Sequence, residues 1–112
     1  MLKDDNQYVK IDRGMRGDFL EICKSTGIKE AASINKFISR SVEMGDFDID
    51  ITNYDKISTT KTDTRIVFRI AKEQKMKFKK LCEENGISAS AAIKMFMYDV
   101  ITSKSMEKYF DK

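Results

Sequence analysis

Few residue types in this chain could support catalysis or metal binding. Histidine is absent, which excludes Ser-His-Asp and Cys-His mechanisms and zinc sites that use histidine. Five aspartates lie between residues 46 and 63, but that segment lacks the loop glycine of a calcium-binding EF-hand. We therefore expect that the protein is not an enzyme and that it needs no cofactor and no metal.

The composition is that of a small protein with one compact domain or two very small ones. The chain has 112 residues, of which 41% are apolar, with no proline and five glycines, so regular structure should dominate. A net charge of +3 excludes a polybasic tail. Neither a transmembrane run nor a secretory signal is evident, which predicts a cytoplasmic protein with no membrane partner. Cys23 and Cys82 are then expected to be free thiols, packed as small hydrophobic side chains.

The sequence contains an internal repeat with an offset of 59 residues. No gap is needed over about forty residues, which makes chance a poor explanation. The identical pairs include Ile11 and Ile70, Phe19 and Phe78, Cys23 and Cys82, Gly27 and Gly86, Ile34 and Ile93, and Phe37 and Phe96.

The second copy has the clearer pattern. The apolar residues Ile66, Phe68 and Ile70 recur at every second position of residues 65–70. This period of two predicts a strand in which these three side chains form one face. Strong helix formers over residues 72–85 predict a helix that Gly86 ends. Ser88 is a good N-cap for a second helix, which runs to about residue 103.

The first copy follows the same plan with weaker signals. Val9 and Ile11 form the apolar face of a short predicted strand. A helix over about residues 13–26 ends at Gly27. The second helix, over about residues 29–44, begins at a lysine instead of a serine, so its start is less well capped.

An acidic, threonine-rich segment separates the copies. It covers residues 46–63 and carries a net charge of −3, against +1 for residues 1–45 and +5 for the rest. At its beginning, over residues 46–51, aspartates alternate strictly with apolar residues, and this part could form a short strand. The remainder resembles a flexible linker. We therefore divide the chain into a first copy (1–45), a linker (46–63), a second copy (64–104) and a tail (105–112).

A unit of one strand and two helices cannot enclose a core by itself, because its strand has no partner. Pairing the two copies predicts a mainly α fold with a two-stranded antiparallel ribbon above four helices, in the order β-α-α-linker-β-α-α. The 18-residue linker can span about 60 Å when extended. That length allows the copies to pair within one chain or to be exchanged between two chains.

These elements and their spacing resemble the ribbon-helix-helix family of DNA-binding proteins, which includes Arc, MetJ and CopG. The resemblance covers both copies, since the strand, the turn glycine and the start of the second helix recur at the expected offsets. Residues 78–96, FKKLCEENGISASAAIKMF, are especially similar to the RelB/DinJ antitoxin branch. Double-stranded DNA as a partner, and a bacterial, plasmid or phage origin, are what this resemblance implies.

The resemblance also assigns DNA contacts to two groups of residues. Family members insert the ribbon into the major groove, where its outward side chains reach base edges. In this sequence those side chains are Arg65, Val67 and Arg69 of the second copy and Asn6, Tyr8 and Lys10 of the first. In family members the start of each second helix also holds a DNA phosphate with backbone N–H groups. The matching residues are Ser88, Ala89 and Ser90, with Lys29 in the first copy and Lys72 as a flanking lysine. Glu30 departs from this pattern, because an acid at that helix start repels phosphate.

The function expected from this resemblance is sequence-specific DNA binding by a transcriptional repressor or by an autoregulator of its own promoter. Because the outward residues of the two strands differ, each pair of copies should read an asymmetric half-site, and such pairs could associate further along DNA. One alternative is an antitoxin with a toxin partner, although residues 105–112 form a short tail for that role and residues 46–63 could serve instead. Others are a plasmid partition or relaxosome accessory protein, and a protein-binding module that has lost DNA contact.

Overall fold

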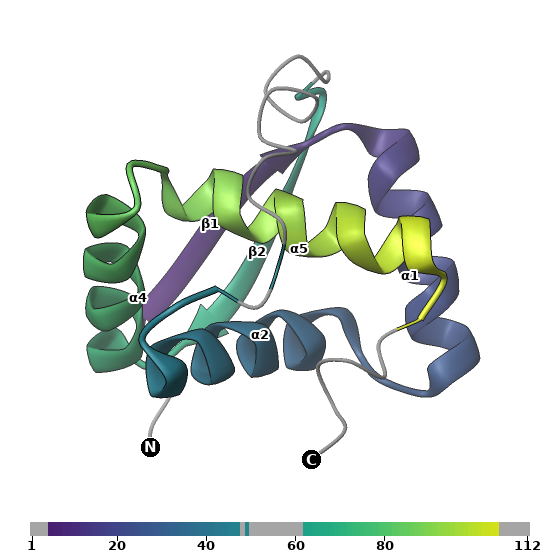
Figure 1. Ribbon diagram of the computed structural model, residues 1–112. Helices are drawn as coiled ribbons and strands as arrows, with labels where there is room; N and C mark the ends of the chain where they lie inside the picture. The colour runs from purple at the N-terminus through teal and green to yellow at the C-terminus, as the bar shows by residue number, and fades with distance from the viewer. Residues whose placement is uncertain (1–4, 48, 50–61, 106–112) are drawn as a thin grey trace.

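The computed structural model describes residues 5–47, 49 and 62–105. Its elements are β1 (Asp5–Ile11), α1 (Arg13–Thr26), α2 (Glu30–Met44), β2 (Thr64–Ile70), α4 (Lys72–Glu84) and α5 (Ala89–Ser103) (Figure 1). Adding the repeat offset of 59 to the bounds of β1 and α2 gives the bounds of β2 and α5. The predicted β-α-α-β-α-α arrangement is therefore confirmed.

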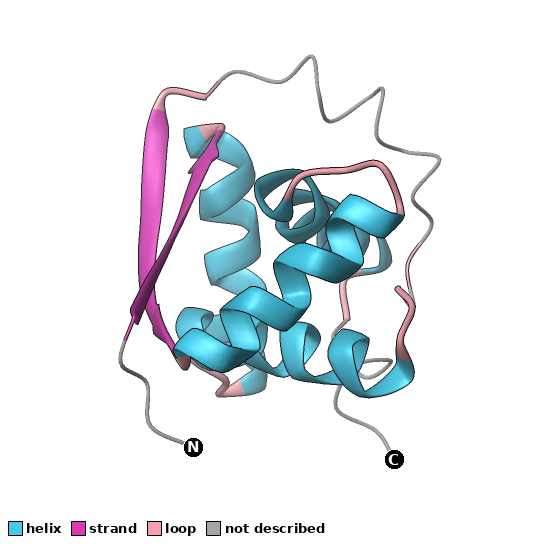
Figure 2. Ribbon diagram, turned by 90° about the vertical axis from the view of Figure 1, so that its left-hand side faces the viewer, coloured by secondary structure: helices cyan, strands magenta, loops and turns pink. Residues whose placement is uncertain are grey.

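The two strands pair with each other in an antiparallel ribbon within one chain. Tyr8 lies opposite Val67 at the middle of the ribbon, and the pairs on either side extend over all seven residues of each strand. The helices lie on one side of the two strands, and the other side faces outward (Figure 2). The apolar residues predicted for the inner face are buried there: Val9, Ile11, Ile66, Phe68 and Ile70.

The helix ends follow the predicted signals in most places. Gly27 ends α1 in the left-handed conformation, with φ 77°, and the Oγ of Ser88 caps α5 by accepting a hydrogen bond from the N–H of Ala91 at 3.0 Å. Lys29 gives α2 no side-chain cap, as expected. The cap of α1 was not predicted: Oδ2 of Asp12 accepts from the N–H of Met15 at 2.9 Å. None of the helices in the described part of the chain is long and apolar enough to cross a membrane.

Phenylalanine rings from different helices form the centre of the core. The ring of Phe37, on α2, stacks on that of Phe96, on α5, at a centroid distance of 4.6 Å. It also meets the edge of Phe78, on α4, at 5.9 Å, and Phe96 contacts Phe19, on α1, at 5.7 Å. Because these rings come from both copies, each copy completes the core of the other.

The segment after α2 differs from the predicted linker at its beginning. Gly45, with φ 69°, turns the chain back over the helices, and Phe47 is buried against Phe37 and Phe78 at 6.3 and 5.9 Å. Ile49 also packs against the core. The short strand suggested over residues 46–51 is not formed by the described residues there, which lie outside β1 and β2. Residues 48 and 50–61 lie outside the described residues.

Both cysteines are buried and free, which confirms the prediction that they act as small core residues. Burial raises the pKa of the Cys82 thiol to about 12, and the nearby carboxylate of Glu83 adds to the rise. Burial is also the main reason why the pKa of Cys23 is raised. Since the thiolate is the reactive form, both side chains should be chemically inert in the folded protein.

The raised pKa of Cys82 predicts a loss of stability at alkaline pH. Above the ordinary value of 9.0 the unfolded chain releases the thiol proton, whereas the folded chain keeps it up to about pH 12, so rising pH favours unfolding in that interval. Below pH 9 the thiol keeps its proton in both states, so its contribution to the free energy of unfolding does not change with pH. Between about pH 8 and about pH 10.5, the free energy of unfolding measured in urea should therefore fall more for the wild type than for Cys82→Ala. Equal losses in the two proteins would contradict this.

Candidate nucleic-acid interface

The outer face of the ribbon gathers all six side chains that were predicted to contact bases. The register places them directly opposite one another in three pairs: Asn6 with Arg69, Tyr8 with Val67, and Lys10 with Arg65. Tyr8 and Val67 are 49% and 47% exposed. The face therefore has a central apolar pair between two pairs that each contain an arginine, and none of the six residues is acidic.

Tyr8 and Arg65 interact across the two strands. The guanidinium carbon of Arg65 lies 5.3 Å from the centroid of the Tyr8 ring, within the range of a cation–π interaction. At an exposed position such a contact contributes about 0.5–1 kcal/mol, enough to favour one orientation of a long side chain. The ring thus helps to position the guanidinium on the outer face before any ligand binds.

Side chains from three helices hold the backbone of the ribbon. The Lys75 ammonium, on α4, donates to the carbonyl of Asn6 at 2.7 Å, and the Ser90 hydroxyl, on α5, donates to that of Tyr8 at 3.3 Å. On the other strand, the amide of Asn35, on α2, donates to the carbonyl of Arg69 at 3.0 Å. All three anchored carbonyls belong to residues of the outer face. These positioning contacts were not predicted, because they join residues that are distant in sequence.

One end of the ribbon is further stabilised by charge. The backbone N–H of Asn6 is the main reason why the pKa of the Asp5 carboxyl is lowered, and the charges of Lys75 and Lys72 also lower it. The Lys75 ammonium lies 3.5 Å from the Asp5 carboxylate. Lys72, predicted as a flanking phosphate contact, is exposed at the start of α4, near this end of the ribbon.

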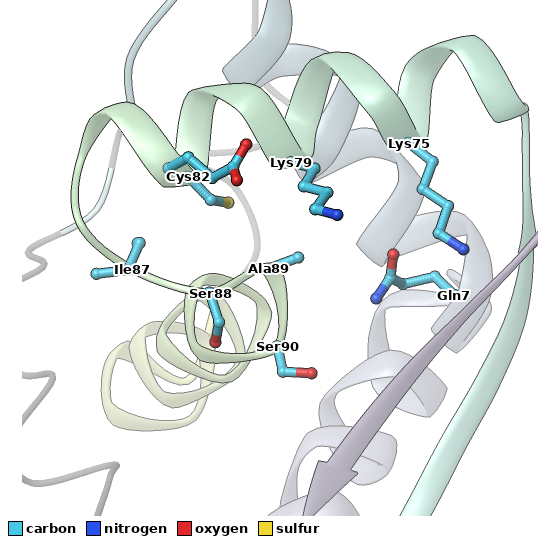
Figure 3. Close-up of a pocket in the computed structure, with 9 residues that line it drawn as sticks. Gln7, Lys75, Lys79, Cys82, Ile87, Ser88, Ala89 and Ser90 are labelled. Atoms are coloured by element: carbon cyan, nitrogen blue, oxygen red, sulfur yellow. The ribbon is translucent and has the colours of Figure 1, made fainter.

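The start of α5 borders a cavity of about 410 Å³ between α4 and β1. Lys75 and Lys79 extend from α4 into this space, opposite the first turn of α5 (Figure 3). The first backbone N–H groups of a helix have no acceptor within it, and the helix dipole makes this end positive. The predicted phosphate-contacting residues Ser88, Ala89 and Ser90 line the cavity. Glu83 lines the same cavity, so its border contains one carboxylate beside the two lysines.

The start of α2 is arranged differently. Glu30, its first residue, accepts two hydrogen bonds from Arg16, to Oε2 and Oε1, each 3.1 Å long. This contact raises the pKa of Arg16, and only 16% of the Glu30 side chain is exposed. With the repeat offset, Arg16 corresponds to Lys75 and Glu30 to Ala89. The predicted phosphate contact of Lys29 thus lies beside a carboxylate and a cation that already neutralise each other.

The RelB antitoxin family matches residues 63–107 of this chain. The RelB match covers the second copy, with β2, α4 and α5, and leaves β1, α1 and α2 outside. It includes Arg65, Val67, Arg69 and the serines at the start of α5. Comparison with curated proteins and with solved structures gave no match. The copy that resembles RelB antitoxins is therefore also the copy with the two outward arginines, and its second helix begins with Ala89 where that of the first copy begins with Glu30.

Proposed function

We propose that the protein binds double-stranded DNA through the outer face of its ribbon and acts as a transcriptional repressor, one that regulates its own promoter. The observation that carries this proposal is the composition of that face. Three cationic side chains, Lys10, Arg65 and Arg69, surround an exposed apolar pair on a two-stranded ribbon, a shape that the major groove admits. The absence of acidic residues among the six outward positions supports an anionic partner.

We assign base contacts and phosphate contacts to different parts of this surface. Arginine can bond the O6 and N7 atoms of guanine with two parallel hydrogen bonds, so Arg65 and Arg69 read bases. The start of α5, together with Lys79, holds a phosphate and fixes the position of the ribbon on the duplex. Because β1 and β2 present different side chains, the preferred half-site is asymmetric.

Selection from short genomic DNA fragments tests this proposal. The full chain is expected to enrich one sequence class at both low and moderate salt, since base contacts add to the salt-dependent attraction of phosphates. Unlabelled competitor of random sequence should displace the protein from non-selected fragments but not from the enriched one. A selection that yields no enriched sequence at either salt concentration would overturn the proposal.

The RelB match favours a second role for the same chain, as the antitoxin of a toxin-antitoxin pair. Autoregulation and toxin binding are compatible, since the ribbon uses one side of the fold and leaves the helices available. Co-expression with the product of a toxin-sized reading frame next to the gene tests this role. We expect this chain to relieve growth arrest and to co-purify with that product. Continued growth arrest in cells that contain the folded chain would count against it.

Removing the Glu30 carboxylate should strengthen DNA binding. In Glu30→Ala the Arg16 guanidinium loses its partner, and the start of α2 becomes available to a phosphate as the start of α5 is. One additional phosphate contact steepens the slope of log affinity against log salt by about 0.9. Fluorescence anisotropy across a salt series measures this slope.

Glu43→Ala is the matched control for Glu30→Ala. It removes the same charge from the exposed far end of α2, thirteen residues along the helix and so about 20 Å away. The salt slope of this control should stay close to that of the wild type. Equal slopes in all three proteins would show that the ion pair does not block a phosphate contact.

A further inference from the structure

The exposed pair Tyr8–Val67 is the one outward pair whose side chains carry no charge and present mostly apolar surface. Both side chains stand at the middle of the outer face, directly opposite each other, and about half of each is accessible. An aromatic ring and an isopropyl group side by side offer van der Waals contact, and no charge, to a ligand that lies on this face. A base edge in the major groove offers one apolar group, the 5-methyl of thymine.

We infer that Tyr8 and Val67 form a thymine-methyl reader at the centre of the binding site. This inference rests on the proposed DNA binding and specifies which base the middle of the ribbon selects. Neighbouring outward pairs are two residues apart, which is about 6.7 Å along a strand. Two base-pair steps of DNA rise about 6.8 Å. The major groove winds around the helix axis, so a step along the groove is longer than the axial rise, and the three pairs address positions about one to two base pairs apart.

The contact between Arg65 and Tyr8 adds a constraint on the neighbouring base. The guanidinium carbon lies 5.3 Å from the ring centroid, which corresponds to about one to two base-pair steps. If Tyr8 covers a thymine methyl and Arg65 bonds a guanine, the two bases must be close neighbours. The selected site should therefore contain a thymine within about two base pairs of a guanine.

Replacing thymine by uracil tests the inference, because uracil lacks the methyl group but keeps every hydrogen-bonding atom. Each thymine of the selected site is replaced in turn, and the affinity of the full chain is measured by fluorescence anisotropy. The loss of one buried methyl contact should weaken binding about fourfold at the central position. Uracil outside the sequence covered by the ribbon should have no effect.

Two variants assign the uracil effect to the apolar pair. In Val67→Ser and in Tyr8→Ser the ratio of the affinity for thymine DNA to the affinity for uracil DNA should fall towards one. Lys10→Ala is the matched control on the same face, since it should weaken binding to both DNAs equally and preserve their ratio. Circular dichroism melting shows whether each variant remains folded at the temperature of the assay.

The outcomes separate the inference from the proposed function. A central uracil effect that Val67→Ser or Tyr8→Ser removes and Lys10→Ala preserves supports the methyl reader. Site-specific binding that is indifferent to uracil at every position, or a selected site with no central thymine, overturns the reader while leaving DNA binding intact. A chain that selects no DNA overturns both.

Discussion

The double substitution Arg65→Ala/Arg69→Ala is expected to abolish the preference for the selected DNA site. Each arginine that bonds a guanine with two hydrogen bonds contributes about 1–3 kcal/mol of discrimination, so losing both should reduce site-specific affinity by roughly 30-fold or more. Weak binding that depends strongly on salt should remain, because the start of α5 and its lysines are unchanged. Titration of selected and random duplexes at two salt concentrations measures both components.

The matched control removes two positive charges that lie outside the outer face of the ribbon. Lys24, in the last turn of α1, is replaced by alanine, and Lys104, at the end of α5, is replaced by asparagine. Asparagine is chosen because Lys104 has φ 57°, a left-handed conformation that asparagine tolerates well. Helix α5 is about 22 Å long, and its first turn contacts β1, so Lys104 lies well away from the interface. If this control loses as much specificity as the arginine variant, base contacts are not the cause.

Replacing Phe37 by alanine is expected to cost about 3–5 kcal/mol of the free energy of unfolding. Its ring is 1% exposed and contacts three other phenylalanines, from α4, α5 and the segment after α2. The truncation leaves a cavity where both copies meet, which the surrounding helices cannot fill without moving. Since domains of this size have a total stability of about 5–15 kcal/mol, the variant should be partly unfolded at physiological temperature.

Urea denaturation followed by circular dichroism measures the Phe37→Ala effect. Leu20→Ala is the control, because Leu20 is an apolar residue on α1 that is 40% exposed, and its loss should change stability by only about 0.5 kcal/mol. Phe47→Ala should fall between the two, since Phe47 contacts the cluster from the core edge. Equal, small effects for Phe37 and Leu20 would contradict a single core shared by both copies.

The local elements of this fold could be predicted from the sequence. The period of two over residues 65–70 identifies which side chains share a strand face, and it separates the buried Phe68 from the exposed Val67 and Arg69. Gly27, Gly86 and Ser88 mark helix ends, because φ values of 77° and 70° favour glycine and a serine hydroxyl caps a free N–H. The repeat offset carries these assignments to the weaker first copy. Such signals act over a few residues of backbone, so they are visible without the rest of the fold.

The burial of Phe47 is an example of what those signals miss. A threonine-rich, acidic segment predicts a linker, and the apolar alternation at its beginning suggests a strand with no obvious partner. In the structure Phe47 packs on rings from α2 and α4, which the turn at Gly45 brings within its reach. Its environment depends on where two helices lie relative to each other, and no local pattern encodes that.

The residues that position the candidate interface were decided by the tertiary structure alone. Lys75 and Arg16 occupy equivalent places in the repeat, yet one anchors the carbonyl of Asn6, 69 residues away, and the other is bound by Glu30. The sequence by itself determined the ribbon, its outward side chains and the two-helix units beneath it, because periodicity and helix ends follow from local backbone geometry. That Glu30 binds Arg16 at the start of α2, and that both strands pair within one chain, followed only from the fold. Long charged side chains have many rotamers, so each can bind any suitable group that the folded chain brings within its reach.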